Sequence, residues 1–145
     1  MAITINGNGT IGGITAGGLP DGTIDTDVLA ANAVTEAKLG SDEQKGLAKA
    51  WVNFNGTGTV AIRSSFNVAS LTDNGTGDYT ITFTAAMGDA NYICTGTSGV
   101  SNTASQTLCP NFDVAAPTTS AMRIQTTNSA NIQDRPYNHV AVFGN

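Results

Sequence analysis

Residues 50–84, AWVNFNGTGTVAIRSSFNVASLTDNGTGDYTITFT, decide the fold. Apolar and other side chains alternate over residues 50–55, where Ala50, Val52 and Phe54 share one side. This period of two predicts a strand with one buried face. The alternation over residues 78–84 is the clearest in the chain and predicts a second strand of the same kind. Both strands indicate an all-β core.

Turn-forming residues punctuate this stretch and the rest of the chain. The sequence Asn-Gly-Thr-Gly occurs at residues 55–58 and again at 74–77, which predicts two tight turns. Between them we expect a short strand at 60–62 followed by an irregular crossing. About seven to nine short strands with regularly spaced turns predict a mainly β fold, an antiparallel β-sandwich of jelly-roll-like type, with a terminal strand at 139–143.

Composition restricts the class of function. Only 12% of the 145 residues are charged, 17 are glycine, and the net charge is −5. Nucleic-acid binding depends largely on Lys and Arg side chains that neutralise phosphates, so a nucleic-acid partner is not expected. The chain has no basic, apolar leader and no run of about 20 apolar residues, so neither a signal peptide nor a membrane partner is expected.

The N-terminal residues have a different character. Residues 1–24 are rich in glycine, and two short strands are expected, around Ile3 and Ile5 and at 10–14. So few bulky side chains cannot offset the entropy of ordering this segment alone. We therefore predict that it binds a surface of sister chains or of another protein. The predicted contact residues are Ile3, Ile5, Ile11, Ile14, Leu19 and, from the sandwich, Trp51.

A connector is expected between this arm and the sandwich. Short helical pieces are predicted over residues 27–33, near 35–39, and from Ser41, with Ser41 as the N-cap residue. No lysine follows Lys49, and strand patterning begins beside it. We therefore predict an anchoring arm and connector at residues 1–49 and a β-sandwich knob at residues 50–145.

No catalytic group or cofactor site is predicted, and the chain is not expected to be an enzyme. His139 is the only histidine, and no orienting partner for it can be identified. The spacing of Asp21, Asp25 and Asp27 does not fit a calcium loop, and the acidic residues around the second turn are interpreted as turn-formers, so no metal site is predicted. Cys94 and Cys109 could face each other across a hairpin, either as thiols or as a disulfide formed later.

Residues 50–83 with the following AMGDANYICTG resemble a domain of tail-fibre and other virion proteins of tailed bacteriophages, including cyanophages. The lead-in ITINGNGTIGGITAGGLPDGTIDTDVLAANAVTEAKL, with its LPDGTI and AVTEAKL phrases, is similar to the glycine-rich lead-in of such proteins. The resemblance implies a structural module, commonly trimeric, without an active site. It departs from the fibre pattern because the lead-in runs almost directly into the globular domain.

Two interpretations of function follow. The first is a structural virion component, a homotrimeric capsid decoration (cement) protein or short fibre, assembled in the host cytoplasm and bound to capsid, tail or neck proteins. The second is a carbohydrate-binding or receptor-binding tip that contacts a host-surface glycan. Trp51, Tyr92 and Tyr137 are the candidate sugar platforms among nine aromatic residues (one Trp, three Tyr, five Phe). Trp51 faces away from the predicted core, where it either caps one end of the sandwich or anchors a subunit contact.

Overall fold

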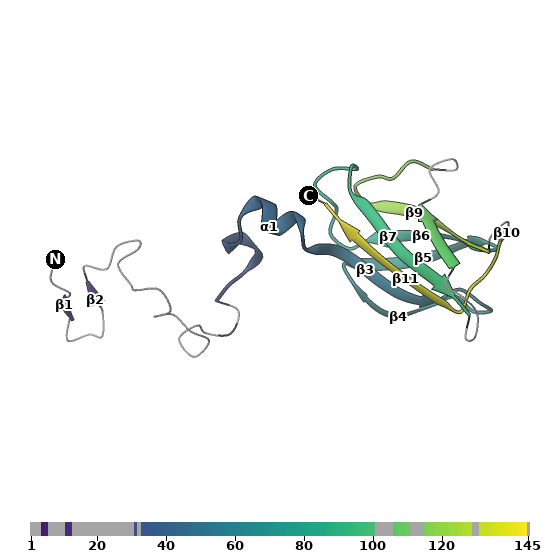
Figure 1. Ribbon diagram of the computed structural model, residues 1–145, viewed down its shortest axis with the longest axis horizontal. Helices are drawn as coiled ribbons and strands as arrows, with labels where there is room; N and C mark the ends of the chain where they lie inside the picture. Colours follow the sequence, from purple (N-terminus) through teal and green to yellow (C-terminus); the bar gives the residue numbers. More distant parts are fainter. Residues whose placement is uncertain are drawn as a thin grey trace. The chain divides into compact units, whose positions relative to one another are not determined.

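The computed structural model describes residues 4–5, 11–12, 31, 33–100, 106–110, 115–128 and 131–144 (Figure 1). For residues 4–5, 11–12, 106–110 and 128 it describes the backbone alone. The chain divides into two compact units, Met1–Leu39 and Gly40–Asn145. This division lies before α1, whereas the sequence places the boundary at Lys49, after it.

The first unit contains two short strands and one turn of helix. β1 (Thr4–Ile5) and β2 (Ile11–Gly12) pair antiparallel, so the predicted short strands are confirmed. η1 (Glu36–Lys38) is a 3-10 helix where a helical turn was expected. The helical piece at 27–33 lies almost wholly outside the described residues. So do the predicted contact residues Ile3, Ile14 and Leu19, and the side chains of Ile5 and Ile11 are also outside them.

The second unit opens with a short helix, α1 (Ser41–Lys45). Its N-cap is Gly40, so the prediction that Ser41 caps the helix is wrong by one residue. Ser41 is itself the first helical residue, and Gly40 supplies an extended backbone (φ −64°, ψ 161°) without a side-chain hydrogen bond. Gly46 ends the helix after little more than one turn.

The rest of the second unit is an antiparallel β-sandwich, as the sequence predicts. One continuous ladder runs in the order β4-β3-β11-β7-β8-β9-β6-β5, with β10 paired to β9. Its strands are β3 (Ala48–Asn55), β4 (Ala61–Phe66), β5 (Val68–Gly75), β6 (Asp78–Phe83), β7 (Ile93–Gly99), β8 (Gln106–Pro110), β9 (Ala121–Asn128), β10 (Asn131–Ile132) and β11 (Tyr137–Phe143).

The ladder passes from one layer to the other at β8, and the chain makes the same passage between β4 and β5. The first part of β8 pairs with β7, and Leu108, Cys109 and Pro110 pair with β9. β4 and β5 are the two ends of the ladder, and in sequence they are separated only by Asn67, which has a positive φ of 56°. One layer therefore consists of β4, β3, β11 and β7, and the other of β5, β6 and β9, as Figure 1 shows for the strands it labels.

The core lies between these two layers. The predicted inward positions of β3 are buried, and Tyr79, Ile81 and Phe83 of β6 are buried opposite them. The rings of Phe54 and Tyr79 meet edge to face across the layers, with centroids 5.0 Å apart and planes at 68°. Val140 and Val142 of β11, Met122 and Ile124 of β9 and Met87, which follows β6, complete the buried set.

The expectation of an irregular crossing after residue 62 is wrong. β4 continues to Phe66 and β5 runs from Val68 to Gly75, so Asn67 alone interrupts strand structure. Most side chains of these two strands are exposed. Because each lies at an end of the ladder, the two strands do not show the strict alternation that marks β3 and β6.

Candidate functional site

The outer face of the β4-β3-β11-β7 layer gathers the features most suited to binding. Since Ala50, Val52 and Phe54 point into the core, the alternate residues of β3 point outward. The pairing register aligns these with outward residues of the neighbouring strands. The two central rows are Phe66, Trp51, Ala141 and Thr95, followed by Ser64, Asn53, His139 and Thr97. We call this surface the outer face.

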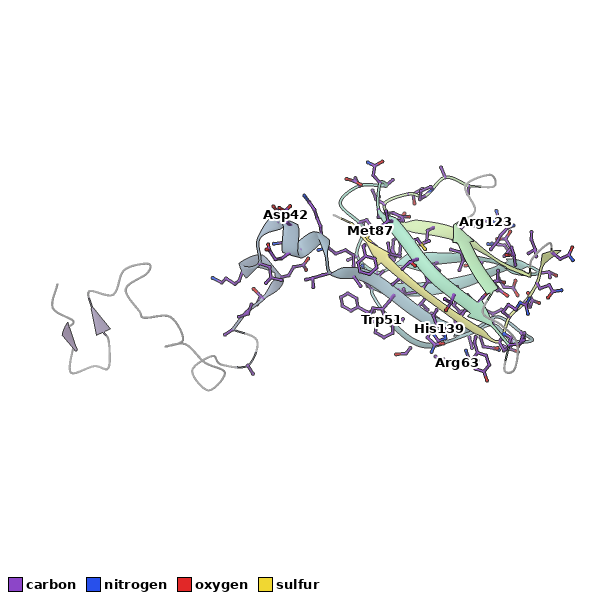
Figure 2. All side chains as sticks on the ribbon, in the orientation of Figure 1. Asp42, Trp51, Arg63, Met87, Arg123 and His139 are labelled. Atoms are coloured by element: carbon purple, nitrogen blue, oxygen red, sulfur yellow. The ribbon has the colours of Figure 1, made fainter. Side chains whose placement is uncertain are left out.

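A hollow of about 510 Å³ lies on the outer face. Its lining includes Trp51 and the whole second row of the outer face. In the first row, the large indole ring of Trp51 is followed by the small side chains of Ala141 and Thr95. This change in side-chain size from β3 to β11 and β7 accounts for the depression. Trp51, His139 and Arg63 can be followed on this side of the sandwich in Figure 2.

Trp51 projects from the sheet, as the sequence predicts. The residue is 39% exposed and lies in the middle of β3, between Phe66 of β4 and Ala141 of β11. A position in mid-strand does not suit a residue that caps one end of the sandwich. Its neighbour Phe66, which the sequence analysis did not single out, is 54% exposed and extends the aromatic surface.

The other two candidate platforms are less available. Tyr92 packs edge to face on Phe83, with centroids 5.7 Å apart, and its hydroxyl lies 3.1 Å from the backbone oxygens of Thr118 and Ala121. Burial raises the pKa of Tyr92 to about 12. Tyr137 is 45% exposed, but the guanidinium of Arg63 lies 5.1 Å from its ring centroid. Tyr137 is thus more exposed than Trp51, but its ring already contacts Arg63, so Trp51 is the better candidate platform.

Polar groups border the hollow. Arg63 Nη1 donates to the backbone oxygen of Phe54 (2.9 Å) and to Asn53 Oδ1 (3.4 Å), which orients the Asn53 amide at the edge of the outer face. His139 is exposed and lines the hollow between Asn53 and Thr97. Amide, hydroxyl and imidazole groups thus accompany the apolar part of the lining, and among the residues that the structure describes the lining includes no Asp, Glu, Lys, Arg or Cys.

The acidic residues of the second turn form structural contacts. Asp73 Oδ1 accepts a hydrogen bond from the backbone N–H of Gly75 (2.9 Å), and Asn74 Nδ2 donates to Thr80 Oγ1 (2.8 Å). Both Asp78 oxygens accept hydrogen bonds from Arg123, at 2.7 Å each. These bonds hold the pKa of the Asp78 carboxyl below its usual value and raise that of Arg123.

A buried polar group that the sequence analysis missed joins the layers at the opposite end from α1. The Tyr79 hydroxyl lies 2.8 Å from the backbone oxygen of Gly56 and 3.0 Å from Asp134 Oδ1, which also accepts from the backbone N–H of Gly77 (2.6 Å). Burial, followed by the Asp134 carboxylate, raises the pKa of Tyr79. Asp134 lies in a loop far from Tyr79 in the sequence, so no local sequence pattern could predict this hydrogen bond.

Metal and thiol chemistry receive no support from the described residues. Within this part of the chain, no three His, Cys, Asp or Glu side chains gather closely enough to hold a metal ion. Asp21, Asp25 and Asp27 lie outside it. Cys94 is opposite Val142 on β11, whereas Cys109 is opposite Gln125 on β9. The Cys109 side chain is not described, so its pairing with Cys94 stays a prediction.

Comparisons with protein-family models, with curated proteins and with solved structures found no match. Among the described residues, no helix is both long and apolar enough to cross a lipid bilayer. The geometry of the outer face therefore has to be interpreted from its own chemistry. An exposed indole ring beside uncharged donors and acceptors is suited to binding a neutral ligand.

Proposed function

We propose that the protein is a structural component of a bacteriophage virion, a homotrimeric capsid decoration (cement) protein or short fibre. Residues of the N-terminal unit attach the chain to capsid, tail or neck proteins, and the sandwich projects from the particle. In this proposal the chain has no catalytic role and no cofactor, and it is found in the virion after assembly in the host cytoplasm.

The observation that carries the proposal is the division of the chain into two unlike units. The second unit, Gly40–Asn145, has a hydrophobic core of its own, and a hydrogen bond between Tyr79 and Asp134 joins its layers at one end. The first unit, Met1–Leu39, has only six sizeable aliphatic side chains in its first 24 residues, which suits a segment stabilised by a partner. Both the glycine-rich lead-in and the sandwich sequence resemble phage virion proteins, which agrees with one attaching unit and one projecting unit.

Trimerisation is part of the same proposal. Closed symmetry lets each copy use the same contact surface, and a small segment gains stability when sister chains cover it. The predicted contacts Ile3, Ile5, Ile11, Ile14 and Leu19 belong to the first unit. We assign the subunit contacts to that unit; Trp51, the sixth predicted contact, lies in the second unit and is not assigned to them.

The test is incorporation into virions that lack the protein. Particles from a phage whose copy of this gene is deleted are incubated with the full chain, with residues 40–145, or with the full-length double variant Ile5→Asp/Ile11→Asp. We expect the full chain to sediment with the particles and both altered proteins to lose binding at least tenfold. The exposed-strand variant Thr72→Asp, on β5, is the control for an added charge.

Each result is decisive. Failure of the full chain to bind particles would refute the virion role, and normal binding by residues 40–145 would refute attachment through the first unit. Sedimentation equilibrium of the full chain tests the trimer, since a monomer at micromolar concentration contradicts it. Unfolding curves of residues 40–145 show whether the sandwich stays folded after truncation.

A further inference from the structure

We propose that the hollow on the outer face is a binding site for a neutral hexopyranose unit of a glycan, with Trp51 as the stacking platform. This inference goes beyond the proposed structural role, which needs no ligand. It assigns a site to residues from three strands, β3, β7 and β11, with β4 at the margin.

Size and shape are the first argument. Ligand pockets commonly enclose about 300–1,000 Å³, and this hollow measures about 510 Å³. Its floor is pleated sheet, and Ala141 keeps that floor low next to the indole ring. A flat ring could therefore lie against the sheet with one edge at Trp51.

The indole ring is the second argument. Trp51 is exposed by 39%, and its backbone is held in the middle of β3, so the sheet sets the place from which the ring projects. Pyranose rings present a patch of C–H bonds on one face, and an aromatic ring offers a large apolar surface with a negative electrostatic face to such hydrogens. Little conformational entropy is lost when a rigid aromatic side chain forms the contact.

Uncharged polar groups are the third argument. Asn53, Ser64, Thr97 and His139 line the hollow and provide both donors and acceptors, as the hydroxyl groups of a sugar require. The described lining contains no Lys or Arg, and Arg63 at its border is already hydrogen-bonded to Phe54 and Asn53, which disfavours a uronic or sialic acid carboxylate. The net charge of −5 also disfavours an acidic glycan.

A second copy of the chain fits this face less well. Specific protein interfaces bury at least about 1,000 Å² in total and have closely packed cores. The two central rows of the outer face hold only two large apolar side chains, Trp51 and Phe66, and a flat partner would leave the hollow unfilled. A sugar unit matches the concave shape better than another sheet does.

The experiment uses the full chain and the fluorescence of Trp51, which is the only tryptophan. The probes are a printed array of neutral, uronic-acid and sialylated oligosaccharides, with bacterial surface polysaccharides and storage glucans among the neutral ones to separate these sources. Hits are then titrated in solution by fluorescence and calorimetry. We expect at least one neutral hexose oligosaccharide to bind with millimolar or better affinity and to shift Trp51 emission to shorter wavelength.

Variants locate the site. Trp51→Ala should weaken binding at least tenfold, Trp51→Phe should restore part of it, and Thr97→Val should weaken it about threefold to tenfold through the loss of one hydrogen bond. Ile93→Ala removes an exposed apolar side chain from β7 outside this hollow and should bind as the unaltered chain does. Melting temperatures of all four variants separate lost binding from lost folding.

Three results would overturn the assignment. They are the absence of any neutral hit, a preference for acidic oligosaccharides, and a Trp51 emission that changes with protein concentration through self-association. Virion incorporation of Trp51→Ala is measured in a separate assay. A loss of sugar binding in this variant therefore says nothing against the virion role, and a loss of incorporation says nothing against the sugar site. A variant that incorporates normally but no longer binds sugar would separate the two roles directly.

Discussion

The two layers of the sandwich share one core but have contrasting outward faces. On the β5-β6-β9 layer, polar side chains bind one another: Arg123 and Asp78 form two hydrogen bonds of 2.7 Å, and Asn74 bonds Thr80. On the outer face of the other layer, Trp51 and Phe66 are exposed beside small residues, and a hollow remains. One face satisfies its polar groups internally, whereas the other leaves apolar and polar groups open to a ligand.

The contrast depends on the corner that holds the two layers together, and the largest effect is expected there. Asn67 Nδ2 donates to the backbone oxygens of Lys49 (2.9 Å) and Ala85 (3.1 Å), and Asn67 Oδ1 accepts from the N–H of Ala85 (2.7 Å). Asn67→Ala removes these bonds and places alanine at φ 56°. We expect it to lower the free energy of unfolding by about 2–4 kcal/mol, measured by urea denaturation.

Asn67→Gly is the matched control for that corner. Glycine also loses the three hydrogen bonds but adopts positive φ without strain, so it should be less destabilising than alanine by about 1 kcal/mol. Equal stabilities of the alanine variant and the unaltered chain would show that this corner does not hold the layers together.

An intermediate effect is expected on the polar face. Arg123→Gln breaks the pair with Asp78, and we expect it to lower the free energy of unfolding at neutral pH by less than Asn67→Ala does. The pKa of Asp78 is lowered in the folded chain from its usual 3.8. The stabilisation is therefore complete above that value and is lost as the pH falls through the lower, folded-state pKa.

Stability measured from pH 7 to pH 2 checks this prediction. The difference between Arg123→Gln and the unaltered chain should be constant at neutral pH and should shrink only below about pH 4. Asp78→Asn removes the titrating carboxyl, so its own stability should lack this acid-dependent loss, and its difference from the unaltered chain should shrink in the same pH range. A difference that is unchanged at pH 2 would contradict the role of this ion pair.

The smallest effect on stability is expected on the outer face. Phe66 is 54% exposed, so Phe66→Ala should change the free energy of unfolding by no more than about 0.5 kcal/mol. Phe83→Ala, which truncates the same side chain in the core, is the control and should cost several times more. A large loss from Phe66→Ala would mean that the exposed rings serve the fold rather than a ligand.

The parts of the fold that sequence could predict are those with local signals. Strict alternation in β3 and β6 correctly indicated which side chains are buried, and the outward direction of Trp51 followed from it. The strands β4 and β5 were missed in part because they lie at the ends of the ladder, where exposed polar residues obscure the period of two.

The sequence could predict individual residues of the candidate site but not which residues lie together in it. Trp51 was recognised as a possible platform, but the hollow exists because β3 pairs with β11, which places Ala141 and His139 beside Trp51 and Asn53. That register joins residues from opposite ends of the second unit. Neither hydrophobic period nor turn chemistry encodes it, so the association of these residues required the structure.

The position of β11 bears on how the protein is made. This strand, Tyr137–Phe143, is inserted between β3 and β7, both of which are synthesised much earlier. Until it emerges from the ribosome, a nascent chain exposes two unpaired strand edges, and such edges favour aggregation. The sheet can therefore close only after β11 has emerged, and holdase chaperones that shield β3 and β7 in the interval should raise the yield of native protein.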